Sequence, residues 1–242
     1  MNLLIDMGNT RLKWAIAVGG QITVGAPLLN ALINRQELIG IWKGICPRRL
    51  VVSWVGENRL VELVLSVAFE LWLDVDIIRV KPQALGFGVM NAYRQPEQLG
   101  VDRWLTLVAV RRYYPGFTCI VDCGTAVTVD LIDADGRHQG GLISPGLTLM
   151  KKALGQGTKA LHFSETNHVF GLADNTGAAI YSGTLMAVIG LIEHVLAKQP
   201  STLQLILTGG DAELIAGKLD VKATVDSDLV LRGLLCVLEE QA

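Results

Sequence analysis

Two stretches of this sequence share one pattern and decide the fold. The first is Leu3-Leu4-Ile5-Asp6-Met7-Gly8-Asn9-Thr10, and the second is Cys119-Ile120-Val121-Asp122-Cys123-Gly124-Thr125. In each, an apolar run typical of a buried strand ends in an aspartate, which a glycine and a hydroxyl residue follow. Two such turns facing each other across a cleft suit a nucleotide triphosphate and its metal ion. The pattern therefore indicates a phosphoryl-transfer enzyme.

The chain around each aspartate follows the same plan. Strand-like runs separated by turn residues come after both, at residues 12–18, 21–24, 125–132 and 141–143. The copies lie about half the chain apart, and Pro115-Gly116 directly precedes the second. We therefore expect two duplicated α/β domains, residues 1–115 and 116–242. Each is expected to be a mixed sheet flanked by helices, with the nucleotide cleft between them.

The remaining periodicity predicts the elements between these strands. Helical patterns cover residues 28–42, 57–73 and 97–113, and two more helices are expected from about 147 and from about 175. Short strands are expected at 50–54, 77–80 and 203–207, and residues 86–96 and 155–171 read as irregular.

Composition excludes several classes of protein. The chain has 242 residues, of which 50% are hydrophobic and 18% charged, with a net charge of −2, so a folded globular protein is expected. Acids and bases are interspersed, which leaves no basic patch for nucleic acid. The uncharged run 175–192 is about as long as a membrane span, but its polar residues and glycines favour a buried helix.

No export signal or cysteine framework is expected. Asp6 interrupts the N-terminal apolar run, and no basic segment precedes it. The four cysteines have neither metal-ligand nor disulfide spacing, so we expect reduced thiols in the core of a cytoplasmic protein with no membrane contact.

The residues of the two turns suit a triphosphate. Gly8 and Gly124 allow backbone amides to approach phosphate oxygens closely. Asp6 and Asp122, each at the end of a strand, could hold cations directly or through water. Further donors and one positive charge come from Asn9, Thr10, Thr125 and Lys13. No Walker-type sequence is present, so a P-loop enzyme is excluded.

A second cluster lies between the two copies, at residues 91–103. It places the carboxylate of Asp102 beside the guanidinium of Arg103, near the start of the helix expected after Pro96. A kinase that phosphorylates an alcohol needs a carboxylate near that hydroxyl, and arginine suits an anionic substrate group. An ordinary ion pair or a helix cap remains an alternative for this cluster alone.

Taken together, these segments resemble the type III pantothenate kinase family nearly from end to end. The resemblance implies that both domains are ribonuclease-H-like, of the actin-like ATPase type found in the acetate-kinase, sugar-kinase and actin superfamily. The matching segments are Asp6-x-Gly8-Asn9-Thr10-x-x-Lys13, Asn91-x-Tyr93-x-x-Pro96-x-x-Leu99-Gly100-x-Asp102-Arg103, Asp122-x-Gly124-Thr125-Ala126-x-Thr128-x-Asp130, Gly140-Gly141-x-Ile143-x-Pro145-Gly146 and Thr176-x-x-Ala179-Ile180-x-Ser182-Gly183. The resemblance implies ATP-dependent phosphorylation of pantothenate to 4′-phosphopantothenate, the first step of coenzyme A biosynthesis.

The resemblance also implies the role of each site residue. Asp102 would be the general base, Asp122 would bind K⁺ or NH₄⁺, and Asp6 would hold Mg²⁺ through water. Pantothenate would contact Tyr93, Gly100, Val101, Asp102, Arg103 and Thr176. ATP would contact Asp6, Met7, Gly8, Asn9, Thr10, Arg11, Leu12, Lys13 and Thr125. The family is dimeric, so a homodimer with the substrate near its interface is expected, and Thr176 would come from the partner subunit.

Two other functions are compatible with parts of the pattern. A kinase of the same superfamily could act on a different small hydroxy acid. A nucleotide-binding regulator is a second alternative, because some relatives were described as accessory factors in transcription. An inactive regulator should have lost Asp102, Lys13 or Asp122, and all three are present.

Overall fold

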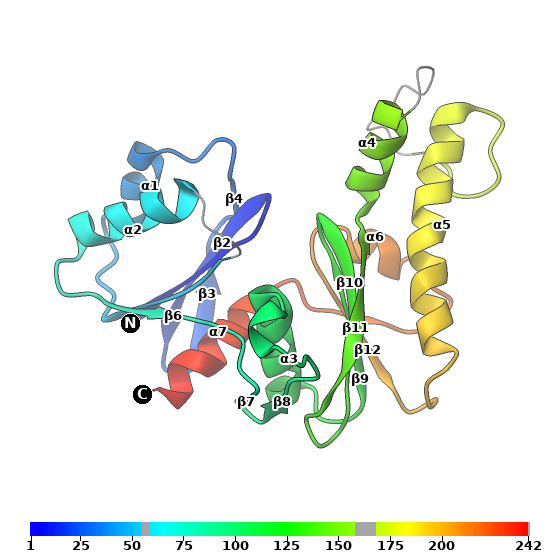
Figure 1. Ribbon diagram of the computed structural model, residues 1–242. Helices are drawn as coiled ribbons and strands as arrows, with labels where there is room; N and C mark the ends of the chain where they lie inside the picture. Colours follow the sequence, from blue (N-terminus) through cyan, green and yellow to red (C-terminus); the bar gives the residue numbers. More distant parts are fainter. Residues whose placement is uncertain (55–58, 158–167, 242) are drawn as a thin grey trace. The chain divides into compact units, whose positions relative to one another are not determined.

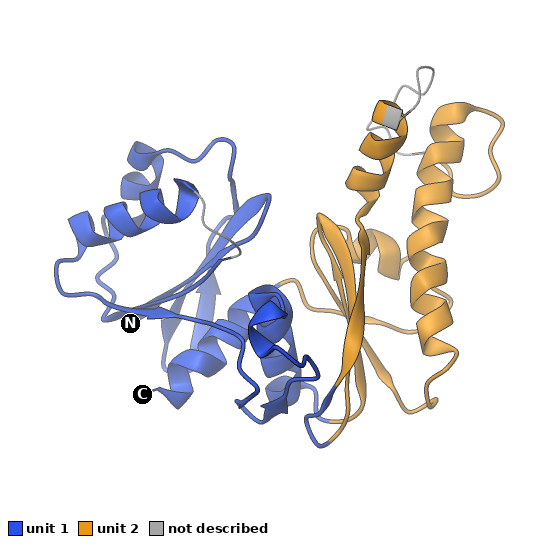
Figure 2. Ribbon diagram, in the orientation of Figure 1, with its two compact units in different colours: residues 1–115, 135–138, 228–242 blue, residues 116–134, 139–227 orange. Residues whose placement is uncertain are grey.

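The computed structural model describes residues 1–54, 59–157 and 168–241. By contacts the chain forms two compact units (Figure 2): unit 1 contains residues 1–115, 135–138 and 228–242, and unit 2 contains 116–134 and 139–227. The last helix, α7 (Leu229–Glu240), joins unit 1 because it packs on α3 (Val101–Tyr113) and β1 (Asn2–Met7). The division into domains 1–115 and 116–242 stays a prediction.

Unit 1 is built on a six-stranded mixed sheet (Figure 1). Its order is β3-β2-β1-β5-β6, and β4 pairs with β2. Strand β1 is antiparallel to β2 and parallel to β5, which is itself parallel to β6. The other strands are β2 (Arg11–Val18), β3 (Gln21–Val24), β4 (Leu28–Leu29), β5 (Arg49–Trp54) and β6 (Asp76–Arg79).

The alternation of side chains along β1 places Asp6 on one face of this sheet. Leu3, Ile5 and Met7 belong to a core shared with α1 (Arg35–Trp42) and α2 (Arg59–Leu71). Because neighbouring residues of a strand point to opposite faces, Asp6 lies on the other face. Helices α3 and α7 pack on these strands outside that core. The sequence of β1 therefore directs the first aspartate toward the side that carries α3.

Unit 2 repeats the same plan. Its sheet has the order β11-β10-β9-β12-β13, with β9 antiparallel to β10 and parallel to β12. Order and sense match the first sheet, which confirms the expected pair of mixed sheets flanked by helices. Its elements are β9 (Thr118–Cys123), β10 (Ala126–Ile132), β11 (His138–Pro145), β12 (Gln204–Thr208), β13 (Thr224–Val225), α4 (Leu147–Gly157), α5 (Thr176–Leu196) and α6 (Ala212–Ala216).

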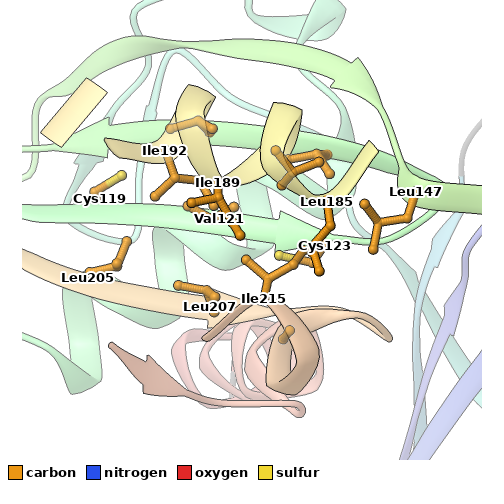
Figure 3. Close-up of a cluster of buried hydrophobic side chains, with 14 of the residues drawn as sticks. Cys119, Val121, Cys123, Leu147, Leu185, Ile189, Ile192, Leu205, Leu207 and Ile215 are labelled. Carbon is orange, nitrogen blue, oxygen red and sulfur yellow. The ribbon is translucent and has the colours of Figure 1, made fainter. Parts of the chain in front are cut away.

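The core of unit 2 lies between β9, β12 and the long helix α5 (Figure 3). Val121 and the thiols of Cys119 and Cys123 point toward Ile189 and its neighbours on α5. Burial raises the pKa of the Cys119 thiol to about 12, and it also raises that of Cys123. Both are therefore neutral packing groups, as expected, and Asp122 between them points to the opposite face of the sheet.

Two predicted helices differ from the structure. The helix expected at 28–42 is wrong in its first half: β4 comes first, and α1 begins at Arg35 because the Asn34 side chain accepts a hydrogen bond from the Glu37 amide (3.0 Å). The helix expected at 97–113 is a 3₁₀ turn, Pro96–Gln98, followed by α3. Leu99 is extended between them, so the helix begins at Val101.

Other segments were missed or lie outside the described residues. Residues 86–96, expected to be irregular, contain part of a small hairpin of β7 (Leu85–Gly86) and β8 (Val89–Met90). The predicted helix start at 57 and most of the stretch 155–171 fall outside the described part of the chain. Helix α5 is long and apolar enough to cross a membrane by length and composition, but one face packs on the unit 2 sheet.

Candidate active site

The turn after β1, residues 8–11, is held by two hydrogen bonds, one of which engages the Gly8 amide. The Gly8 amide donates to the carbonyl of Arg11 (3.2 Å), and the Asn30 side chain donates to the carbonyl of Gly8 (2.8 Å). Residues Asn9, Thr10 and Arg11 are exposed. The side chains of Met7 and Leu12 are buried in the core, so these two predicted ATP contacts could act only through their backbones.

Asp6 is buried beside this turn, with 8% of its surface exposed. Ser53, its registered neighbour on β5, donates a hydrogen bond to the Asp6 carboxylate (2.7 Å), and Lys13 is its neighbour on β2. Burial raises the pKa of Asp6 to about 6; the charge of Asp102 adds to this rise, while Ser53 and Lys13 oppose it. The site thus prefers either a proton or a cation at Asp6.

Asp102 lies in the first turn of α3, where a helix favours negative charge. Its Oδ1 accepts a hydrogen bond from the Arg103 amide (2.8 Å). A Cβ on Gly100 would lie 2.5 Å from the same oxygen, so a larger residue there would shift this carboxylate. Helix α3 packs on β5, the neighbour of β1, and the charge of Asp102 contributes to the raised pKa of Asp6, so the two predicted motifs lie on one side of the unit 1 sheet.

Arg103 and Tyr93 form the second part of the predicted substrate motif. Arg103 is 4% exposed, and its Nη1 donates to the Tyr93 hydroxyl (2.8 Å). The guanidinium also lies over the Tyr93 ring, 5.5 Å from its centroid. The Val101 side chain is buried, so it could contact a substrate only through its backbone. The pair thus presents a positioned cation beside Asp102.

In unit 2, two segments that contain glycine pack on the second turn, residues 124–125, and on the aspartate before it. The Gly146 amide donates to the carbonyl of Thr125 (2.9 Å), and a Cβ at Gly146 would overlap the Gly124 carbonyl oxygen. Gly209 has a φ of +94°, and a Cβ there would lie 2.5 Å from Oδ1 of Asp122. The segment 208–211 therefore packs directly on the second aspartate.

The surroundings of Asp122 parallel those of Asp6, with one difference. Asp122 is registered with Thr128 on β10 and Thr208 on β12, as Asp6 is with Lys13 and Ser53. Ser53 donates to its aspartate, whereas the Thr208 hydroxyl, fully buried, has no hydrogen-bond partner among the described residues. A buried hydroxyl without a partner costs stability unless a ligand satisfies it.

Thr176 is the first residue of α5 and lies in unit 2. Asn175 caps the helix by accepting a hydrogen bond from the Ala178 amide (3.0 Å), which leaves Thr176 exposed at the helix start. It lines a groove of about 970 Å³, mostly apolar, together with Met150 and Leu154 of α4 and Gly183 of α5. Thr176 therefore borders an uncovered surface of unit 2.

Ser53 and Thr208 were missed by sequence analysis. Each lies opposite an aspartate on the neighbouring parallel strand, and register, which the sequence alone leaves open, decides that neighbour. Within the described ranges, no three His, Cys, Asp or Glu residues cluster to hold a metal ion.

Comparison with solved structures defines the class of protein. A Campylobacter jejuni protein assigned to the Baf family of transcriptional activators matches 99% of this chain and 98% of its own, with a TM-score of 0.63 and 22% identity. The Arthrobacter inorganic polyphosphate/ATP-glucomannokinase matches 100% of this chain and 99% of its own, with a TM-score of 0.50 and 12% identity. The chain thus shares its fold with sugar kinases.

Sequence comparison then gives the family. The family model for type III pantothenate kinase matches residues 2–198. The type III pantothenate kinase of Nitrosococcus oceani is 39% identical, over 99% of this chain and 94% of its own length. That of Laribacter hongkongensis is 37% identical, over 97% of each. The chain belongs to the type III pantothenate kinase family, as its motifs predicted.

Proposed function

We propose that this protein transfers the γ-phosphoryl group of ATP to the primary hydroxyl of pantothenate, giving 4′-phosphopantothenate for coenzyme A synthesis. One observation carries the assignment of the site: α3, which begins with Asp102, packs on β5, the strand directly beside Asp6 in the sheet. An acceptor hydroxyl at Asp102 would thus lie near phosphates held at residues 8–11. A kinase needs this proximity more than any other feature.

Asp102 acts as the general base in this proposal. One carboxylate oxygen is held by the Arg103 amide (2.8 Å), which fixes the direction of the other. That other oxygen accepts the proton of the attacking hydroxyl. Arg103 binds the carboxylate of pantothenate, because a guanidinium matches a carboxylate in two parallel hydrogen bonds. Tyr93 orients this guanidinium, and Gly100 and Val101 line the substrate with backbone atoms.

The two turns bind the phosphates. Backbone amides of the first turn and the side chains of Asn9, Thr10 and Arg11 donate to phosphate oxygens, and Lys13 adds positive charge. Thr125 donates from the second turn. The side chains of Met7 and Leu12 support the first turn from the core.

Asp6 fits a role as an outer ligand of the divalent ion that accompanies ATP. Its raised pKa shows a buried carboxylate that lacks full compensation for its charge, which a nearby hydrated Mg²⁺ would supply. When bound, the ion neutralises charge on the phosphate oxygens.

Asp122 fits a monovalent cation, K⁺ or NH₄⁺. A single carboxylate with the buried hydroxyl of Thr208 is a weakly charged oxygen site, which suits a monovalent ion better than a dehydrated divalent one. The unpartnered hydroxyl of Thr208 supports this assignment, since a cation there would satisfy it.

The exposed face of α5 supports a homodimer. Thr176, Ala179, Gly183, Met186 and Gly190 recur at helical spacing and are all exposed. A stripe of small and apolar residues beside an apolar groove is typical of a surface that another chain covers. A second copy would do so by two-fold symmetry, bringing Thr176 to its partner's substrate. It would also account for the apolar α5 in a protein that we expect in the cytoplasm.

The test is an assay of purified protein with ATP, Mg²⁺ and a panel of small hydroxy acids, each in K⁺, NH₄⁺ or Na⁺. We expect 4′-phosphopantothenate from pantothenate in K⁺ or NH₄⁺, with at least tenfold less turnover in Na⁺ alone. Preference for another hydroxy acid by kcat/KM would refute the substrate. Equal turnover in Na⁺ would refute the cation at Asp122 without affecting the rest.

A further inference from the structure

His138 comes from the second half of the sequence but belongs to unit 1, together with residues 135–137. The Met90 amide donates to the carbonyl of Gly136 (2.8 Å), and Met90 and Arg137 form a parallel bridge. Gly136 has a φ of +86°, and a Cβ there would overlap the Gly88 carbonyl oxygen. The backbone that leads into His138 is thus fixed against the β7–β8 hairpin, directly before the substrate motif.

The imidazole of His138 packs on that motif. It is 4% exposed, and its ring stacks on the Tyr93 ring with 6.2 Å between centroids and 13° between planes. Its Nδ1 accepts a hydrogen bond from the Ala92 amide (3.4 Å).

Tyr93 is consequently held on several sides. Asn91 accepts from the Tyr93 amide (3.0 Å), Arg103 donates to the hydroxyl (2.8 Å), and His138 covers a ring face. A displaced ring would take the Arg103 guanidinium with it, because the two share a hydrogen bond and a cation–π contact. Of these residues, only His138 lies outside the segment that sequence analysis singled out.

We propose that His138 is a positioning residue for pantothenate: it orients Tyr93 by stacking and, through Tyr93, the guanidinium of Arg103. The inference rests on the proposed substrate site. It differs from simple core packing in what it predicts. A packing residue would lower stability and affect both substrates alike, whereas a positioning residue affects pantothenate selectively.

The experiment compares steady-state kinetics of H138A and H138F with the exposed-histidine control H194A. We expect H138A to raise the KM for pantothenate about tenfold, with kcat and the KM for ATP within about twofold of wild type. H138F keeps a ring but loses the acceptor for Ala92, so its KM should rise about threefold. If H138A does not fold, H138F decides: a wild-type KM for pantothenate, or an equal rise for ATP, overturns the inference.

A double-mutant cycle with Y93A separates this inference from the site on which it rests. Y93A should itself raise the KM for pantothenate, and H138A should add less than about twofold in that background. An additive, about tenfold effect would overturn positioning through Tyr93. If Y93A leaves the KM unchanged, the substrate site is wrong whatever His138 does.

Discussion

Replacing Asp6 with Asn should stabilise the protein in the absence of metal and nucleotide while it impairs turnover. The folded-state pKa of Asp6 is about 6, against the ordinary aspartate value of 3.8. A difference of about 2 pKa units corresponds to roughly 3 kcal/mol of lost stability above pH 6. The side-chain carbonyl of D6N can still accept the Ser53 hydrogen bond, but its buried amide hydrogens cost part of the gain. We therefore expect a net gain of about 1–2 kcal/mol at pH 7.

The sign follows from the direction of the shift. Because the folded-state pKa of Asp6 is raised, the stability of wild type relative to D6N is fully present below about pH 4, where Asp6 is protonated in both the folded and the unfolded state. Wild type loses this stability as the pH rises through about 6. The advantage of D6N should accordingly be absent near pH 4 and complete by pH 7. For a chain of this size it corresponds to a rise in Tm of roughly 2–8 °C.

The assay is thermal unfolding of wild type and D6N from pH 4 to 8 in EDTA, with the exposed-aspartate variant D74N as the matched control. D74N should show no such pH-dependent difference. With Mg²⁺ and ATP, wild type should gain stability and D6N should gain much less. A D6N protein less stable than wild type at pH 7, or a difference that does not change between pH 4 and 7, would refute the reasoning.

Three further outcomes follow from other parts of the structure. G146A should raise the KM for ATP at least about tenfold, because its methyl group would displace the Gly124 carbonyl. The control G40A, whose methyl group would meet open space on α1, should leave this KM unchanged. Equal KM values for G146A and wild type would contradict the prediction. T208V should have a Tm equal to or higher than that of wild type, because it removes an unsatisfied hydroxyl. It should nevertheless raise the K⁺ concentration for half-maximal activity at least about fivefold. Unchanged activation by K⁺ would contradict the role of Thr208 as a ligand. M186E should shift a dimer toward monomer in light scattering after gel filtration; a dimer as stable as wild type would place the interface elsewhere.

The duplicated architecture could be predicted because local sequence patterns determine it. Apolar runs ending in Asp6 and Asp122, at about half-chain separation, were enough to expect two mixed sheets. Helix starts were less accessible, since they depend on single caps. Because the Asn34 side chain caps α1, this helix begins only at Arg35. Because Leu99 is extended, α3 begins only at Val101.

The supporting residues of the site could not be predicted from the sequence. Ser53 and Thr208 become neighbours of the aspartates only through parallel strand register, which no local signal specifies. His138 approaches Tyr93 only because a chain reversal after β10 brings residues 135–138 against the β7–β8 hairpin. Its spacing from other histidines gave no hint of this role. Local chemistry thus predicted the candidate groups, while their partners depend on tertiary structure.

The central claim is that Asp102 activates the hydroxyl of pantothenate. The most direct measurement is the formation of 4′-phosphopantothenate by wild type and D102N at saturating ATP, Mg²⁺ and K⁺. The side-chain carbonyl of D102N can still accept from the Arg103 amide, so the fold should persist, with a Tm within about 2 °C of wild type. We predict a kcat at least about 100-fold lower. A folded D102N protein that turns over pantothenate at near the wild-type rate would contradict the account.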